Sequence, residues 1–158
     1  ANTRIYCSGP DTSAFEALRD HGLDVRNVGP TIGQASGLKM VYAASTKGTT
    51  ALWTELFVAA HALGLEEALL AEFGPEDALS RRQRNGIPSM PRKARRWVGE
   101  MEEIAATFES LGLTPRILAG AADMYRFVGS TPLADQTSRE PDPPVDEVIA
   151  RLAEHRRE

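Results

Sequence analysis

Two lysines interrupt a long apolar segment of this sequence and are its best candidates for chemistry. Lys39 and Lys47 are the only charged residues of the segment 29–54. The segment opens with glycines at every fourth position, which are Gly29, Gly33 and Gly37. Removing a lysine ammonium from water lowers its pKa, which suits proton transfer near neutral pH. The pattern alone leaves two functions open for Lys39, which are a surface lysine whose ammonium extends into solvent and a lysine general acid or base.

A helix through this segment would place Lys39 on a small, polar face. This face carries Ser36, Lys39, Ala43, Thr46 and Thr50. Lys47 would lie about 80° from Lys39 around such a helix. Glycines at a helix start let a ligand or another backbone come close, or let a loop pack tightly. Their spacing here is not the dinucleotide-binding fingerprint.

Other polar groups offer weaker candidates. Asp123 and Tyr125 lie beside a stretch of small residues, 119–122, and could line a cleft as proton donors. The alternative is that they cap a helix or lie at the surface. A basic cluster surrounds the predicted turn at 85–91 and could bind a phosphate or carboxylate, or pair with Glu100, Glu102 and Glu103 at the surface. Its members are Arg81, Arg82, Arg84, Arg92, Lys93, Arg95 and Arg96.

The composition narrows the class of protein. At 158 residues the chain is long enough for a domain with a core, and its net charge of −4 gives no case for binding nucleic acid or an anionic membrane. No apolar run reaches membrane-spanning length. The single cysteine, Cys7, excludes an internal disulfide and indicates a reducing compartment, so we expect a cytoplasmic protein. His and Cys residues lack metal-ligand spacing, so we expect no metal site.

The first residues predict a β-α-β unit. Alternating side chains indicate strands at 3–9 and 23–28, and a helix between them begins at Asp11 or Thr12 and ends at Gly22. Two strands and one helix make a poor domain, so we expect them to complete a sheet begun elsewhere. The chain starts without Met, which suggests a fragment or a processed chain.

The rest of the chain predicts helices, so the expected fold class is mainly α with a terminal β-α-β unit. A long helix is expected over 33–63, with Gly48 as its weak point. Its predicted buried stripe is Leu38, Val41, Ala44, Leu52, Leu56, Ala59 and Leu63. Shorter helices are predicted at 65–73, 76–84, 91–111, 115–127 and 144–155. Residues 129–144 are rich in Pro and Ser, which indicates a linker or a loop over the surface.

Several runs resemble the β-hydroxyacid dehydrogenase and 6-phosphogluconate dehydrogenase superfamily. They are Arg4-Ile-Tyr-Cys-Ser-Gly-Pro, Leu23-Asp-Val-Arg-Asn-Val-Gly and Ile32-Gly-Gln-Ala-Ser-Gly-Leu-Lys-Met. The segment 35–52 and the run Arg96-Trp-Val-Gly-Glu-Met-Glu-Glu-Ile-Ala look closest to a bacterial branch, the phosphogluconate-dehydrogenase-like C-terminal domain. In the superfamily, the last strands of a Rossmann domain lead into a long helix that carries a catalytic lysine.

The resemblance implies that Lys39 donates or accepts a proton at the substrate oxygen while a hydride moves to or from NADP or NAD. The expected substrate is a hydroxy acid or a related small carbonyl compound. Tyr42 and Ala43 stand where the family has an Asn pair that holds the substrate, and this departure leaves the substrate class open. Gly33 and Gln34, in the turn before the helix, are expected near the cofactor.

The family's nucleotide-binding turn and its Ser-Gly-Gly substrate loop would precede residue 1. We therefore expect residues 1–29 to be the remnant of a Rossmann-type domain and 30–158 to be an all-α substrate and dimerisation domain. The cofactor would be bound mainly by residues outside this chain, in a longer protein or on a separate N-terminal segment. Because related enzymes pair through their helical domains, we expect a homodimer.

Two other functions fit the sequence. One is an imine reductase-like enzyme, in which Asp123 or Tyr125 would reach the cleft as proton donor. The other is a non-catalytic helical module for dimerisation or binding, which the missing nucleotide-binding turn would explain.

Overall fold

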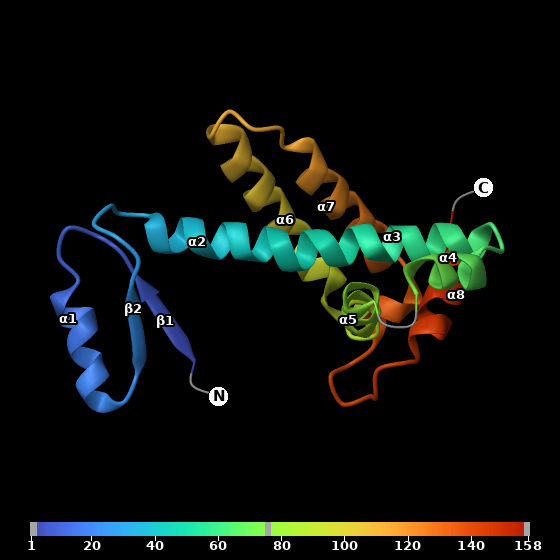
Figure 1. Ribbon diagram of the computed structural model, residues 1–158, viewed down its shortest axis with the longest axis horizontal. Helices are drawn as coiled ribbons and strands as arrows, with labels where there is room; N and C mark the ends of the chain where they lie inside the picture. The colour runs from blue at the N-terminus through green and yellow to red at the C-terminus, as the bar shows by residue number, and fades with distance from the viewer. Residues whose placement is uncertain (1–2, 75–76, 157–158) are drawn as a thin grey trace. The chain divides into compact units, whose positions relative to one another are not determined.

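A computed structural model describes residues 3–74 and 77–156, which form two compact units (Figure 1). The first unit ends at Ala43 and the second begins at Ala44. The sequence placed a domain boundary at residue 30, whereas in the structure the helix that follows this residue belongs to the first unit. That residues 1–29 derive from a Rossmann-type domain stays a prediction.

The first unit contains the predicted β-α-β unit, which is confirmed. Strand β1 (Arg4–Cys7) pairs in parallel with β2 (Asp24–Asn27), with Ile5 opposite Val25. Between the strands lie α1 (Ser13–Glu16) and the 3₁₀ helix η1 (Ala17–His21). The Asp11 carboxylate accepts a hydrogen bond from the Ser13 N–H (2.9 Å), as the sequence suggested for the helix start. Helix α2 (Gln34–Ala43) follows β2 and packs on β1.

The second unit is entirely helical, which confirms the expected fold class. Its elements are η2 (Ala44–Gly48, a π-helix), α3 (Thr49–Ala62), α4 (Glu66–Phe73), α5 (Ala78–Gly86), α6 (Pro91–Ser110), α7 (Arg116–Gly129), η3 (Pro132–Asp135, a 3₁₀ helix) and α8 (Val145–His155). Pro91 occupies the first turn of α6, as predicted. The predicted start of the third helix at residue 76 lies outside the described residues.

The core of the second unit lies between its helices. Helices α6 and α7 lie side by side, and α3 packs against α8, α5 and α7 (Figure 1). The largest fully buried side chains include Phe57, Met101, Ile104, Tyr125, Ile149 and Leu152. No helix in the described part of the chain combines the length and the apolar character that crossing a membrane would require.

The predicted buried stripe of the long helix is wrong. The residues of α3 that are buried are Ala51, Thr54, Phe57, Val58 and Ala60. Leu52 and Leu63, which were expected inside, are 61% and 71% exposed, and Leu38 and Val41 on α2 are exposed too. The inner face of α3 meets α5, α7 and α8, and it does so with small and aromatic side chains. The leucines are left on a face that none of these helices covers.

The segment 129–144 is more than a surface loop. It contains η3, where Thr131, Leu133 and Ala134 are buried against α6 and α7. The Thr131 hydroxyl donates a hydrogen bond to the Val128 carbonyl (2.8 Å), so its polar group is satisfied inside the fold. Residues 137–142 form the longest exposed run of the segment, whereas Leu133 gives it an apolar anchor.

Candidate functional site

The first unit places the start of α2 at the carboxyl ends of its two parallel strands. The Gly9 N–H donates to the Gly29 carbonyl (3.1 Å), and the Val28 N–H donates to the Cys7 carbonyl (3.0 Å). The Ala35 N–H donates to the Ser8 hydroxyl (3.0 Å), which ties the helix to the end of β1. This edge of a parallel sheet is where α/β proteins commonly bind ligands.

Gly29 and Gln34 form a tight corner at this edge. Gly29 has φ +139°, and a Cβ built there would lie 2.2 Å from the Gln34 Oε1. That oxygen accepts a hydrogen bond from the Thr31 N–H (2.9 Å). The corner therefore needs a glycine, and the Gln34 side chain is already used within it. Gly33, with φ +95°, is exposed, and its missing side chain would meet nothing within 4 Å.

Lys39 lies near the middle of α2, and its side chain is exposed. Ser36 and Tyr42 are also exposed, and spacings of three residues bring them to the same face of the helix as Lys39. Ala43 is buried. The structure thus brings three of the predicted residues together on an accessible face, where the ammonium reaches solvent. The proton-transfer role of Lys39 stays a prediction.

The second lysine, Lys47, lies in the second unit and is held by α6. Its ammonium forms an ion pair with Glu100 and lies 5.7 Å from the centre of the Trp97 ring. Its side chain is only 19% exposed. A cation over an indole face and beside a carboxylate is stabilised by both groups. Lys47 therefore has two partners within its own unit.

Lys47 belongs to the π-helix η2, a rare element that is found often at functional sites. Its wider turn leaves carbonyls that need other donors. The hydroxyls of Thr49 and Thr50 both donate to the Thr46 carbonyl (2.9 Å each), and the Tyr125 hydroxyl donates to the Lys47 carbonyl (2.6 Å). Side chains thus satisfy the backbone where the regular ladder is interrupted.

Tyr125 is fully buried, with its ring edge-on to Trp97 at 5.2 Å between ring centres. Burial raises the pKa of Tyr125 well above its usual range, and a hydrogen bond from the Ala51 backbone opposes this rise. The phenol hydroxyl thus joins α7 to the backbone of η2 through the Lys47 carbonyl. The hydroxyl of Tyr125 is buried and hydrogen bonded inside the fold. Its position therefore does not support a role as a proton donor in a cleft.

Asp123 lies one helical turn before Arg126 on α7 and pairs with it. Arg126 also pairs with Glu102 of α6, so the predicted polar group is part of a surface charge network. The Asp123 side chain is well exposed. Asp123 and Tyr125 both belong to the second unit, whereas Ser36, Lys39, Tyr42, Gly33 and Gln34 belong to the first. The substrate contacts predicted for Asp123 and Tyr125 stay predictions.

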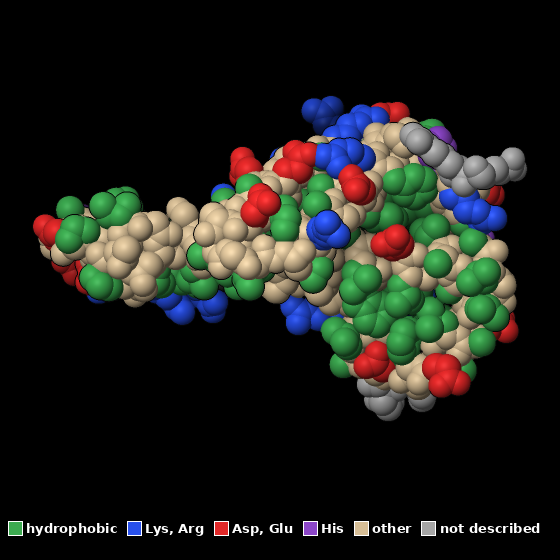
Figure 2. Space-filling view, turned by 90° about the horizontal axis from the view of Figure 1, so that it is seen from above, with side chains coloured by type: hydrophobic (Ala, Val, Ile, Leu, Met, Phe, Trp, Pro, Cys, Tyr) green, Lys and Arg blue, Asp and Glu red, His purple; other side chains and the backbone are tan. Residues whose placement is uncertain are grey.

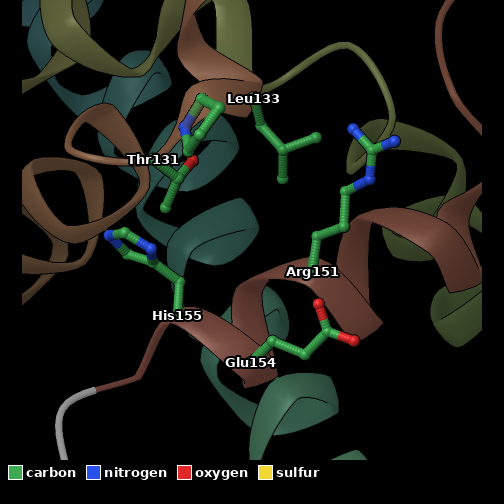
Figure 3. A pocket seen from close by; sticks show the side chains of 6 residues that line it. Thr131, Leu133, Arg151, Glu154 and His155 are labelled. Atoms are coloured by element: carbon green, nitrogen blue, oxygen red, sulfur yellow. The ribbon is translucent and has the colours of Figure 1, made fainter.

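A small pocket of about 360 Å³ opens between η3 and α8 (Figure 3). Arg151, Glu154 and His155 of α8 line it opposite Thr131 and Leu133. Arg151 is paired with Glu147, and the Thr131 hydroxyl is satisfied by Val128. None of the predicted site residues lines this pocket.

The basic cluster pairs mostly with carboxylates other than those predicted. Arg84, Arg92 and Arg95 pair with Asp146, Asp142 and Asp135, respectively, all of them between η3 and the first turn of α8. Of the three glutamates predicted as partners, Glu100 pairs with Arg96 of the cluster. Within residues 3–74 and 77–156, no three His, Cys, Asp or Glu side chains are placed to hold a metal ion.

The sequence identified Lys47 as a candidate, but the residues that contact Lys47 in the structure were not predicted. Trp97 and Glu100 are three residues apart on α6, so their shared face could be predicted, but their distance from Lys47 along the chain hides the pairing. The hydrogen bond from Tyr125 spans 78 residues and has no local sequence signal.

Part of the chain matches a known family and a known relative. Residues 60–128 match the family model of a domain of unknown function, DUF1932. An uncharacterized 28.5 kDa protein in the 7S RNA 5' region of Methanothermus fervidus is 34% identical over 67 residues. This match covers 42% of the chain and 27% of that protein.

Two solved structures resemble nearly the whole chain. A conserved hypothetical protein from Sinorhizobium meliloti 1021 is 25% identical with a TM-score of 0.79, over 98% of this chain and 52% of that one. A conserved protein of unknown function, described as structurally similar to 3-hydroxyacid dehydrogenases, is 32% identical with a TM-score of 0.66, over 81% of this chain and 51% of that one. The chain therefore spans about half the length of these two proteins, and its match to the Methanothermus fervidus protein covers a smaller part of that protein.

Proposed function

We propose that this chain, which has a C-terminal hydroxyacid dehydrogenase-like domain, is the substrate-binding part of an NAD(P)-dependent oxidoreductase that acts on a hydroxy acid or a related small carbonyl compound. The observation that carries this proposal is the similarity, at 32% identity, to a protein described as structurally similar to 3-hydroxyacid dehydrogenases. The exposed Lys39, on the helix that follows the parallel strands, supports it.

Lys39 would be the general acid or base. When a hydroxy acid is oxidised, the neutral amine of Lys39 accepts the proton of the hydroxyl group as the carbon loses its hydride. In the reverse direction the ammonium returns a proton to the carbonyl oxygen. Ser36, on the same face of α2, offers a hydroxyl that can hydrogen bond to the substrate.

The start of α2 fits a nucleotide cofactor in one respect. Gly33 is exposed and has open space where a side chain would lie, so a ligand can approach its backbone. Gln34 fits less well, because its amide oxygen is engaged by Thr31. A bound NAD or NADP would supply the hydride acceptor or donor. Most of its contacts would come from residues outside this chain.

Activity of the complete protein tests this function. We expect at least one hydroxy acid of a panel to reduce NAD or NADP, measured by the absorbance of the reduced nicotinamide. A parallel panel of cyclic imines with the reduced cofactors tests the imine reductase alternative. This chain by itself should bind no nicotinamide cofactor by calorimetry, because the nucleotide-binding turn of the family is not among its residues. Failure of the complete protein to bind either cofactor would exclude the proposal.

We further propose that the chain forms a homodimer through a groove between α3 and α7, which is largely apolar around Leu52 and Ile117 and also carries Asp123 and Arg126 farther along. Two hollows of about 370 and 1100 Å³ share Glu55, Gly120 and Met124 and so form one groove. Small residues line part of it, and Leu52 and Ile117 (76% exposed) lie at its first hollow. Figure 2 shows that apolar side chains gather on one face of the second unit. A contiguous apolar surface of this kind is typical of an interface between proteins.

Replacing Leu52 by glutamate should weaken this dimer. A carboxylate buried in an apolar groove without a partner is costly, so we expect the dimer dissociation constant to rise at least about tenfold. Sedimentation equilibrium measures it. Leu111→Glu is the matched control, because Leu111 is similarly exposed (67%) but does not line the groove. The proposed interface would be contradicted if the chain without substitutions is monomeric. Equal changes of the dissociation constant in Leu52→Glu and Leu111→Glu would contradict it too.

A further inference from the structure

The start of α6 carries more positive than negative charge. Among the described residues, the cations of its first turns and Lys47 beside them are Lys47, Arg92, Lys93, Arg95 and Arg96, and the carboxylates paired with them are Glu100, Asp135 and Asp142. Glu100 serves both Lys47 and Arg96, the latter at 3.5 Å. Asp142 pairs with Arg92, and Asp135 pairs with Arg95. Three carboxylates thus face five cations, and such a surplus attracts anions.

Lys93 stands at the centre of this surplus. Its ammonium donates a hydrogen bond to the Ser89 hydroxyl (3.0 Å) and lies 5.6 Å from the centre of the Trp97 ring. Burial and the charge of Arg92 lower the pKa of Lys93, whereas the charge of Asp142 raises it. An additional anion beside this ammonium would therefore be stabilised.

Asp142 acts on both Arg92 and Lys93, and it comes from an exposed segment. Residues 137–142 are exposed, and they lie between the buried residues Ala134 and Pro143. The Arg92 and Asp142 side chains are themselves 26% and 35% exposed. Solvent reaches both members of this pair, so an anion from solution can compete with Asp142 for Arg92.

We propose that Arg92, Lys93 and the Ser89 hydroxyl form a binding site for a small oxyanion, a phosphate or a carboxylate group, and that Asp142 occupies this site as an internal competitor. The guanidinium offers paired donors to an oxyanion, the ammonium a compact charge and the hydroxyl a further donor. Arrival of the external anion displaces Asp142 and frees residues 137–142. This site is independent of the proposed dehydrogenase activity.

Trp97 reports binding at this site, because Lys93 lies over its ring. The chain has two tryptophans, so a Trp53→Phe background isolates the Trp97 fluorescence. Inorganic phosphate and acetate are titrated separately at constant ionic strength. We expect saturable binding of at least one of them, and the preferred one identifies the chemistry of the ligand. Asp142→Asn should tighten binding about fivefold, the scale of a weak ion pair. Lys93→Gln and Arg92→Gln should each weaken it at least about tenfold.

Asp135→Asn is the matched control, because it removes the same charge from a pair with Arg95 (2.7 Å) outside the site. The affinity of the Asp135→Asn variant for the anion should stay near that of the Trp53→Phe protein. Equal tightening by Asp135→Asn and Asp142→Asn would overturn the proposal, because the effect would then be one of overall charge. Absence of saturable binding, or binding unchanged by both Lys93→Gln and Arg92→Gln in variants with native circular dichroism, would also overturn it.

Discussion

Replacing Lys39 by alanine should lower kcat of the complete protein by about 10²- to 10⁴-fold, the usual contribution of a general acid or base. The side chain is exposed on α2, so its removal leaves no cavity and should not change the free energy of unfolding. Affinity for the nicotinamide cofactor should stay nearly constant. Steady-state kinetics, with cofactor binding measured separately, check this result.

Lys47→Ala is the control for Lys39→Ala. Lys39→Ala should lower kcat without changing stability, whereas Lys47→Ala should lower stability and leave kcat nearly unchanged. Lys47 is largely covered and paired with Glu100, so its loss leaves a carboxylate without its partner and should lower the melting temperature. The kcat of the Lys47→Ala variant should stay within a few-fold of the value for the unsubstituted protein. If Lys39→Ala keeps near-normal turnover, or if Lys47→Ala has the larger kinetic defect, Lys39 is not the catalytic group.

Tyr125 should be among the most sensitive positions for stability. Truncation to alanine removes a fully buried aromatic side chain, which costs about 3–5 kcal/mol in the free energy of unfolding. Tyr125→Phe keeps the ring and removes the hydroxyl that donates to the Lys47 carbonyl. Because it leaves buried polar groups without a partner, we expect it to cost about 1–3 kcal/mol. Urea denaturation followed by circular dichroism measures both variants.

Tyr6→Phe provides the comparison, because Tyr6 is 40% exposed on β1. Its free energy of unfolding should change by no more than about 0.5 kcal/mol. Amide exchange over residues 44–52 adds a local measurement, since η2 and the start of α3 should open more often once the hydroxyl is absent. If Tyr125→Phe is as stable as the parent and exchange in this segment is unchanged, the hydroxyl does not hold η2.

Local signals were sufficient for most elements of the fold. Alternation over 3–9 and 23–28 predicted β1 and β2, and Pro91 and Gly112 marked the limits of α6. These features depend on neighbouring residues, which a sequence displays directly. The buried face of α3 depends instead on which helices reach it, so Leu52 was placed inside by its apolar character alone.

The candidate site was predictable only in part. Ser36 and Lys39 could be placed on one helical face because three residues separate them. The partners of the arginines could not be found in this way, because Asp135, Asp142 and Asp146 lie 40–62 residues away from them. The sequence therefore offered the nearby glutamates of α6 as partners, although most of the pairing goes to the distant aspartates.

The π-helix η2 has a consequence for comparing this chain with its relatives. In a π-helix each hydrogen bond joins residues five apart along the chain instead of four, so each hydrogen-bonded loop contains one residue more than in an α-helix. A relative with a regular helix at this place would align with residues 44–48 only through a one-residue gap. Functional residues should therefore be transferred separately on the two sides of that gap. An ungapped alignment anchored on Lys39 would misassign every position after Gly48, and one anchored on α3 would displace Lys39 by one residue.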